Sequence, residues 1–251
     1  MPRTTLLIAL VLLAALPASG QKWVNVSYPW AFVEHHPAAE MIDDTRDYFV
    51  YGTERGMLFF LERDRMTGAL KMVKQREVWA PVKELQLAEC TGDGRNELVA
   101  VTRNGDLFVI GLGNMKDLWR TPEGYFQSIY CFSVADVDAD DKPEIVLIAD
   151  EKLVIMSGDS DTEEWRSAVD FTATHMVIAD VDADGQLEIV LNTGKVLDAR
   201  FRQLEWEFEG SFGPVMDVFD IDGDGILEIV GQGPNGEVQV VEADQRRVKW
   251  E

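Results

Sequence analysis

Three acidic segments of the sequence carry side-chain oxygens at one repeated spacing. Each has carboxylates at positions 1, 3, 5 and 9 and continues directly into Ile and Val. The segments read DVDADDKPEIV from Asp136, DVDADGQLEIV from Asp180 and DIDGDGILEIV from Asp220. Like charges a few ångströms apart repel by about 1 kcal/mol per pair even in water, so a folded segment of this kind needs a counterion. The spacing therefore predicts that each segment binds a cation.

The predicted ion is Ca²⁺, because carboxylates and a backbone carbonyl form the all-oxygen shell that this cation prefers. Mg²⁺ fits less easily, since it requires near-ideal octahedral geometry and gives up water reluctantly. We predict ligation by the side chains at positions 1, 3, 5 and 9 and by the backbone carbonyl at position 7. These residues are Asp136, Asp138, Asp140, Lys142 and Glu144 in the first segment, Asp180, Asp182, Asp184, Gln186 and Glu188 in the second, and Asp220, Asp222, Asp224, Ile226 and Glu228 in the third.

The segments differ from an EF-hand loop, which needs a glutamate at position 12 and a helix on each side. Here the glutamate stands at position 9 and an apolar run follows it, so the chain is predicted to leave the loop as a buried strand. Position 6 is Gly185 or Gly225, where a left-handed residue lets the chain curl around an ion. Asp141 takes that position in the first segment, and Asp is among the few tolerated substitutes.

A fourth, weaker copy of the segment begins at Glu89 and reads ECTGDGRNELV. Thr91 replaces the second aspartate, so only Glu89, Asp93 and Glu97 remain as charged ligands, and we expect weak calcium binding or none there. A fifth, degraded copy over residues 40–50 reads EMIDDTRDYFV and no longer keeps the alternate spacing.

These loops belong to a longer repeat that predicts the fold. The position-9 glutamates recur every 40 to 47 residues, and tryptophan recurs at a similar period, at positions 23, 79, 119, 165, 206 and 250. Each unit contains four short β-type runs separated by Gly, Asp and Asn turn signals. Because one such sheet cannot bury its own faces, units of this kind are typical of β-propeller blades. We predict an all-β fold, a β-propeller of about five four-stranded blades with calcium loops between the first and second strands; a β-sandwich with coincidental acidic turns is the alternative.

The three complete loops resemble the FG-GAP or VCBS-type repeat, whose DxDxDGxxD/E loops bind Ca²⁺ in propellers such as the integrin α-subunit head. The resemblance covers nearly the whole chain after residue 20, although GSFGPV at residues 210–215 is the nearest match to the FG-GAP words themselves. It implies a calcium-stabilised propeller used for binding and does not specify a ligand. A fainter resemblance of VQVVEADQRRVKW to quinoprotein-type propellers implies that tryptophans dock successive blades.

The N-terminus reads as an export signal. Arg3 precedes an apolar run over residues 6–16 and the small residues Ala18-Ser19-Gly20, so residues 1–20 are predicted to be a signal peptide and residues 21–251 the FG-GAP/VCBS-like propeller domain. A short membrane anchor is the alternative interpretation of the run, and no later stretch is apolar enough for a membrane helix. We expect a secreted or periplasmic protein, with an N-terminal strand, QKWVNVSY, available to complete the last blade.

The remaining chemistry-bearing residues favour binding over catalysis. His35 and His36 would point to opposite faces of a strand and His175 stands alone, so we predict no catalytic residue. Cys90 and Cys131 are the two cysteines, and spacing does not decide whether they pair. A net charge of -22 argues against nucleic acid or anionic lipid as a partner.

The function predicted from the sequence is that of a non-enzymatic recognition or adhesion module for a protein or glycan ligand. Two alternatives stay open at this point. One is a carbohydrate-active enzyme or lyase domain on a propeller scaffold, and the other is a structural repeat segment of a larger exported assembly.

Overall fold

The computed structural model describes residues 38–42 and 47–250. The predicted signal peptide, the N-terminal strand around Trp23 and the histidine pair His35 and His36 lie outside the described residues. The described residues contain strands and turns, and among them no helix is long and apolar enough to cross a membrane.

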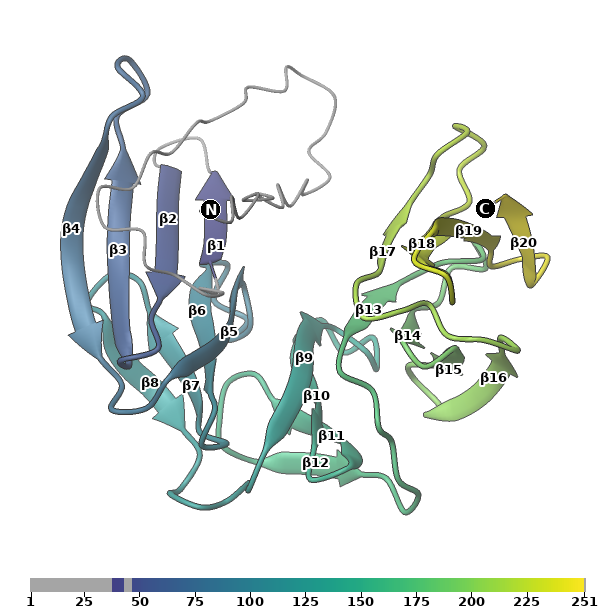
Figure 1. The fold of residues 1–251 in the computed structure, drawn as a ribbon. Coiled ribbons are helices and arrows are strands. Elements are labelled where there is room, and N and C mark those ends of the chain that lie inside the picture. Colours follow the sequence, from purple (N-terminus) through teal and green to yellow (C-terminus); the bar gives the residue numbers. More distant parts are fainter. Residues whose placement is uncertain (1–37, 43–46, 251) are drawn as a thin grey trace, which may run out of the picture. The chain divides into compact units, whose positions relative to one another are not determined.

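The strands form five antiparallel sheets of four strands each, and within every sheet the strands lie in chain order (Figure 1). The first sheet contains β1 (Ala38–Ile42), β2 (Asp47–Gly52), β3 (Met57–Arg63) and β4 (Leu70–Glu77), and the second contains β5 (Val82–Ala88), β6 (Glu97–Thr102), β7 (Leu107–Gly111) and β8 (Lys116–Arg120). The third contains β9 (Ile129–Ala135), β10 (Glu144–Ala149), β11 (Lys152–Ser157) and β12 (Glu163–Arg166). The fourth contains β13 (Met176–Ala179), β14 (Glu188–Leu191), β15 (Lys195–Asp198) and β16 (Gln203–Glu207), and the fifth contains β17 (Asp217–Phe219), β18 (Glu228–Gln232), β19 (Val238–Glu242) and β20 (Arg247–Trp250).

The core lies between successive sheets. The second strands β6, β10 and β14 are buried along their whole length, which explains why their sequences are continuous apolar runs rather than alternating ones. Each buried cluster draws side chains from two consecutive sheets, so the sheets stack face to face in chain order. The first strands of successive sheets also contact one another. This is the blade packing that the repeat predicted, with the acidic loops between first and second strands.

The fourth strand of each sheet contains a β-bulge at the same place. The pairing with the third strand shifts by one residue, and the residue left over is Val73, Leu118, Glu164, Glu205 or Lys249 in the five sheets in order. Bulges bend the strand and re-aim a side chain. The extra residue directly precedes the residue in the tryptophan position of its sheet.

Tryptophan joins neighbouring sheets, as predicted, in the middle of the chain. The Trp119 side chain is buried between the second and third sheets, and its Nε1–H donates a 2.8 Å hydrogen bond to the Gly158 carbonyl oxygen. Trp206 is buried between the fourth and fifth sheets, where its Nε1–H has no hydrogen-bond partner, and Trp165 packs against the cluster between the third and fourth.

The prediction was wrong for Trp79. Its side chain is 82% exposed, and the residue lies beyond the end of β4, with a left-handed φ of 62°. Lys74 occupies the tryptophan position of the first sheet, and its Nζ donates to the Gly113 carbonyl as Trp119 donates to that of Gly158. The period of 40 residues between Trp79 and Trp119 is therefore a coincidence of loop length and not of structural position.

The two cysteines are free and buried. Cys90 belongs to the cluster between the second and third sheets, whereas Cys131 belongs to the cluster between the third and fourth. Burial raises the pKa of both thiols far above the ordinary range, so both are inert packing residues.

Candidate metal-binding loops

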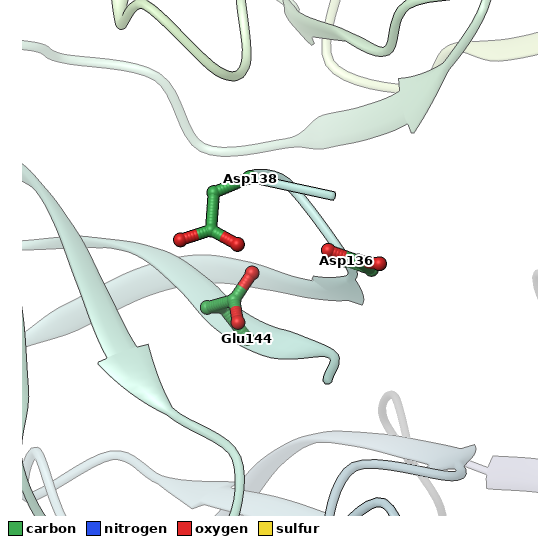
Figure 2. A group of neighbouring side chains, drawn as sticks. All are labelled: Asp136, Asp138 and Glu144. Carbon is green, nitrogen blue, oxygen red and sulfur yellow. The ribbon is translucent and has the colours of Figure 1, made fainter. Parts of the chain in front are cut away.

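The three complete acidic segments occupy equivalent places in three consecutive sheets. The Asp136 loop joins β9 to β10, the Asp180 loop joins β13 to β14, and the Asp220 loop joins β17 to β18. In each loop one oxygen from positions 1, 3 and 9 lies within 4.8 Å of the other two. Figure 2 shows this group in the first loop, with the carboxylates of Asp138 and Glu144 facing each other.

The position-1 carboxylate holds the loop in its curled form. Asp136 Oδ1 accepts the backbone N–H of Ala139 at 2.8 Å, and its Oδ2 accepts that of Asp141 at 3.0 Å. Asp220 accepts the corresponding N–H groups of Gly223 and Gly225, and Asp180 accepts those of Asp184 and Gly185. Folding of the loop backbone therefore depends on this side chain before any ion is considered.

The position-9 glutamate closes the loop from the strand side. Glu144 Oε2 accepts a hydrogen bond from the backbone N–H of Val137 at 2.9 Å. Oε2 of Glu188 and of Glu228 likewise accept from the backbone N–H groups of Val181 and Ile221. Because the first residue of a buried strand supplies the carboxylate, its other oxygen is held at the mouth of the loop. Position 9 is thus set by the strand and positions 1 and 3 by the loop.

Positions 5 and 7 are arranged differently from positions 1, 3 and 9. Oδ1 of the position-5 aspartate accepts the backbone N–H of position 7, at 2.8–2.9 Å in each loop. Within the described residues, the three-oxygen groups do not include these aspartates, Asp140, Asp184 and Asp224. Ligation by them and by the carbonyls of Lys142, Gln186 and Ile226 stays a prediction.

Two positions in each loop have a left-handed backbone, where the sequence predicted one. Position 6 has φ of 67° at Asp141 and 90° at Gly185 and Gly225, as expected. Position 4 is also left-handed, with φ of 64° at Ala139 and 61° at Ala183. Alanine adopts this conformation at a cost, so Ala139 and Ala183 give no sequence signal of a left-handed backbone. The third loop has Gly223 at position 4, and this glycine is the one signal in the three segments.

Burial makes the position-9 carboxylates of the first two loops costly to ionise. Glu144 and Glu188 are 3% and 1% exposed, and loss of solvent, together with the neighbouring aspartates, raises the pKa of Glu144 to about 7 and that of Glu188 to about 8. The backbone N–H bonds at Val137 and Val181 only partly offset this. A cation held at the loop would remove the cost by favouring the charged form.

Two buried oxygens in these groups have no hydrogen-bond partner. They are Oδ1 of Asp138 in the first loop and Oε1 of Glu188 in the second. Leaving a buried carboxylate oxygen unpaired costs free energy that a bound cation would recover. The donor set is all oxygen and carries several negative charges, which fits Ca²⁺.

The Asp220 loop has no such orphan because a lysine reaches it. Lys249 Nζ lies 2.5 Å from Asp222 Oδ2 and 2.8 Å from Glu228 Oε1, and these are the carboxylates of positions 3 and 9. Lys249 comes from the bulge of β20 in the same sheet. The sequence did not reveal this contact because 21 residues separate Lys249 from Glu228.

The bulges of the two preceding sheets place glutamate at the same register position. Partial burial raises the pKa of Glu164, and the charges of Asp138 and Asp140 raise it further. For Glu205 the same two causes act, with Asp182 as the first of the neighbouring charges. Glu164 and Glu205 therefore add negative potential at the first and second loops.

The Glu89 loop is built like the others but gathers fewer ligands. Glu89 Oε1 accepts the N–H groups of Thr91, Gly92 and Asp93, and Glu97 Oε2 accepts that of Cys90. Within the described residues it forms no group of three carboxylate oxygens like those of the complete loops. Its weak or absent calcium binding remains an expectation.

His175, the histidine within the described residues, has a packing contact rather than a place in the loops. Its Nε2 lies 2.9 Å from the Met216 carbonyl oxygen, in the segment that leads to the next sheet.

The stacked four-stranded sheets and their repeated interstrand loops define the chain as a β-propeller. Solved structures of β-propeller-like proteins share this fold. Sqt1 of Saccharomyces cerevisiae matches with a TM-score of 0.60 and 14% identity, covering 81% of this chain and 57% of that one. BamB of Moraxella catarrhalis matches with 0.51 and 14%, covering 83% and 62%, and the V. cholerae biofilm matrix protein Bap1 with 0.54 and 19%, covering 86% and 38%.

This chain therefore spans between 38% and 62% of the length of these structures. At such low identity the likeness shows the fold alone. No protein-family model matches the chain, and no curated protein sequence matches it.

Proposed function

We propose that this chain is a secreted, calcium-binding β-propeller of the FG-GAP or VCBS type that acts as a non-enzymatic recognition or adhesion module. The observation that carries the calcium assignment is the pair of unpartnered buried oxygens, Asp138 Oδ1 and Glu188 Oε1, each within a group of three converging carboxylates. A dication at each group would satisfy the orphan oxygen and neutralise the repulsion that the loop concentrates.

The ion in this proposal stabilises the fold and takes no part in chemistry. The loop carboxylates are engaged with the loop backbone at positions 1, 5 and 9, so they hold the connection between two core strands. Removal of the ion would loosen the entry to β10 and β14, whose side chains belong to the core clusters between the sheets. A calcium-tightened scaffold of this kind suits an extracellular environment, where Ca²⁺ reaches millimolar levels and modules with weak sites are saturated.

The recognition role rests on the architecture and the net charge. Propeller blades present many loops on a rigid frame, and loops on rigid frames are where binding residues gather. The charge of -22 favours cationic or neutral ligands, such as a protein surface or a glycan bridged by calcium. The matrix protein Bap1, whose structure resembles this chain, is a neighbour compatible with an adhesion role.

The calcium assignment predicts that Asp182→Asn removes one equivalent of bound Ca²⁺. Asp182 supplies an oxygen to the group with Asp180 and Glu188, and burial together with the Asp184 charge raises its pKa, which a bound cation would counteract. Equilibrium dialysis against Ca²⁺ would measure the difference from the parent protein. Asp170→Asn is the matched control, because Asp170 pairs with Lys152 outside the loops. Equal calcium uptake by Asp182→Asn and the parent would refute the site.

The recognition assignment predicts saturable retention without turnover on an array of glycans and polysaccharides. The array would be probed with labelled protein in about 2 mM Ca²⁺, which is on the order of extracellular calcium. It would then be probed again with EDTA in excess over the calcium. We expect retention in calcium and its loss in EDTA, because the chelator loosens the loops that frame the surface. Release of sugar fragments would instead favour the enzyme interpretation and contradict a binding-only module.

A further inference from the structure

We propose that the residue in the β-bulge of each fourth strand decides which cation the adjacent acidic loop takes. The Lys249 ammonium takes the place of a bound cation in the Asp220 loop, whereas Glu164 and Glu205 favour Ca²⁺ binding in the Asp136 and Asp180 loops. The protein then binds two calcium ions where the sequence spacing alone predicts three. The inference rests on the proposed calcium binding and adds to it the number and identity of the occupied sites.

The first observation is the position of the Lys249 ammonium. Its Nζ contacts one oxygen of Asp222 and one of Glu228 and lies 3.5 Å from Glu242 Oε1. Asp222 and Glu228 are two of the three carboxylates that converge in this loop. The ammonium therefore lies where a cation shared by positions 3 and 9 would lie. Glu228 is 2% exposed, whereas the Lys249 and Asp222 side chains are 20% and 43% exposed, so the ammonium bridges a buried carboxylate and a solvent-facing one.

The second observation is a comparison of equivalent atoms in the three loops. Glu228 Oε1 accepts a hydrogen bond from Lys249, but Glu188 Oε1, at the same position of the Asp180 loop, has no partner. In the Asp136 loop the orphan is at position 3, Asp138 Oδ1, whose counterpart Asp222 is also bonded to Lys249. Lys249 bonds to oxygens of Asp222 and Glu228 in its loop, and each of the other two loops keeps one buried carboxylate oxygen without a hydrogen-bond partner.

The third observation is that the chemistry of the bulge residue follows the chemistry of the loop. The first sheet has a degraded loop and the second an incomplete one, and their bulge residues are the apolar Val73 and Leu118. Ionisable bulge residues occur where the loop is complete, namely Glu164, Glu205 and Lys249. In the third, fourth and fifth sheets this residue is charged and interacts with the acidic loop of its own sheet.

The size of the effect follows from charge arithmetic. A Ca²⁺ ion about 4 Å from the Lys249 ammonium would bind about 30-fold more weakly than without it, even with the screening of bulk water. Glutamate at the same place has the opposite effect, since calcium affinity in oxygen sites rises with the count of negative charges. Exchanging lysine for glutamate therefore separates an excluded site from a competent one.

Calorimetric titration with CaCl₂ tests this inference on the purified protein. The parent is expected to bind two equivalents, Lys249→Glu three and Glu205→Lys one. Lys152→Glu is the matched control, because it makes the same charge reversal at a lysine that pairs with Asp170 outside the loops. It should leave two equivalents. Circular dichroism before each titration would show that the variants are folded, and Glu205→Lys provides a second, independent direction of change.

The outcomes separate this inference from the calcium proposal on which it rests. Three equivalents in the parent would overturn the role of the bulge residue and leave calcium binding intact. Two equivalents in the parent, in Lys249→Glu and in Glu205→Lys alike would do the same. No uptake by the parent or by Lys249→Glu would overturn the calcium proposal itself. A gain of one equivalent in Lys249→Glu together with a loss of one in Glu205→Lys supports the assignment.

Discussion

Replacement of Trp119 by alanine is expected to lower the free energy of unfolding by about 3–5 kcal/mol. The indole is buried between the second and third sheets, where it contacts side chains of both, and its N–H bonds to the Gly158 carbonyl. Removing it leaves a cavity at the contact of two blades and an unpaired carbonyl, and both effects act in the same direction. Urea unfolding followed by circular dichroism would measure the loss.

Trp79→Ala is the matched control for this prediction. The substitution is chemically the same, but the Trp79 side chain is 82% exposed, so we expect a change within about 0.5 kcal/mol. If the two variants lost equal stability, the assignment of Trp119 as the residue that docks the blades would be incorrect. The pair therefore tests structural position rather than residue type.

Addition of 10 mM Ca²⁺ to chelator-treated protein is expected to stabilise it by about 3–5 kcal/mol. This range follows from two sites with dissociation constants of about 0.1–1 mM, which contribute about 1.4–2.7 kcal/mol each by mass action. Thermal unfolding would show the change as a higher melting temperature in calcium than in EDTA. The same concentration of Mg²⁺ is the control and should shift the melting temperature much less.

The calcium effect is also expected to grow with pH. Without calcium, the pKa values of Glu144 and Glu188 are raised in the folded protein to about 7 and about 8, from 4.5 when exposed. Their protonated forms contribute stability that is fully present below about pH 4.5 and is lost as the pH rises to about 8. Calcium replaces the proton and restores that stability.

The melting temperature in EDTA should therefore fall between pH 5.5 and pH 8, while the gain from calcium should increase over the same interval. A melting temperature independent of calcium at both pH values would count against the bound ion. A calcium gain that stayed constant with pH would show that Glu144 and Glu188 are not the carboxylates that exchange a proton for the ion.

The local pattern of the chain was sufficient to predict the blades. The second strand of each of the last four units is a mostly apolar run that starts at the position-9 glutamate. Such a run indicates a buried strand, and it identified β6, β10, β14 and β18 together with the loops before them. The predicted strands around the Asp180 loop correspond to β13, β14, β15 and β16. Residues close in sequence decide these features, because hairpin connections bring neighbouring strands together.

Features that depend on the register of distant strands were not predictable. Trp79 has the right type and spacing but lies outside its strand, and Lys74 holds the place that the pattern assigned to tryptophan. Left-handed alanines at position 4 gave no sequence signal, because alanine rarely adopts that conformation unless the surrounding loop imposes it.

The sequence by itself determined the repeat, the all-β class and the carboxylates that can meet at each loop, since alternate spacing and turn residues act within about ten positions. Only the tertiary structure decided which charge faces those carboxylates from across the sheet. Lys249, Glu164 and Glu205 stand at one register position with opposite charges. Their effect on the loops depends on a register shift between the third and fourth strands, and electrostatic interactions follow distance in space rather than separation along the chain.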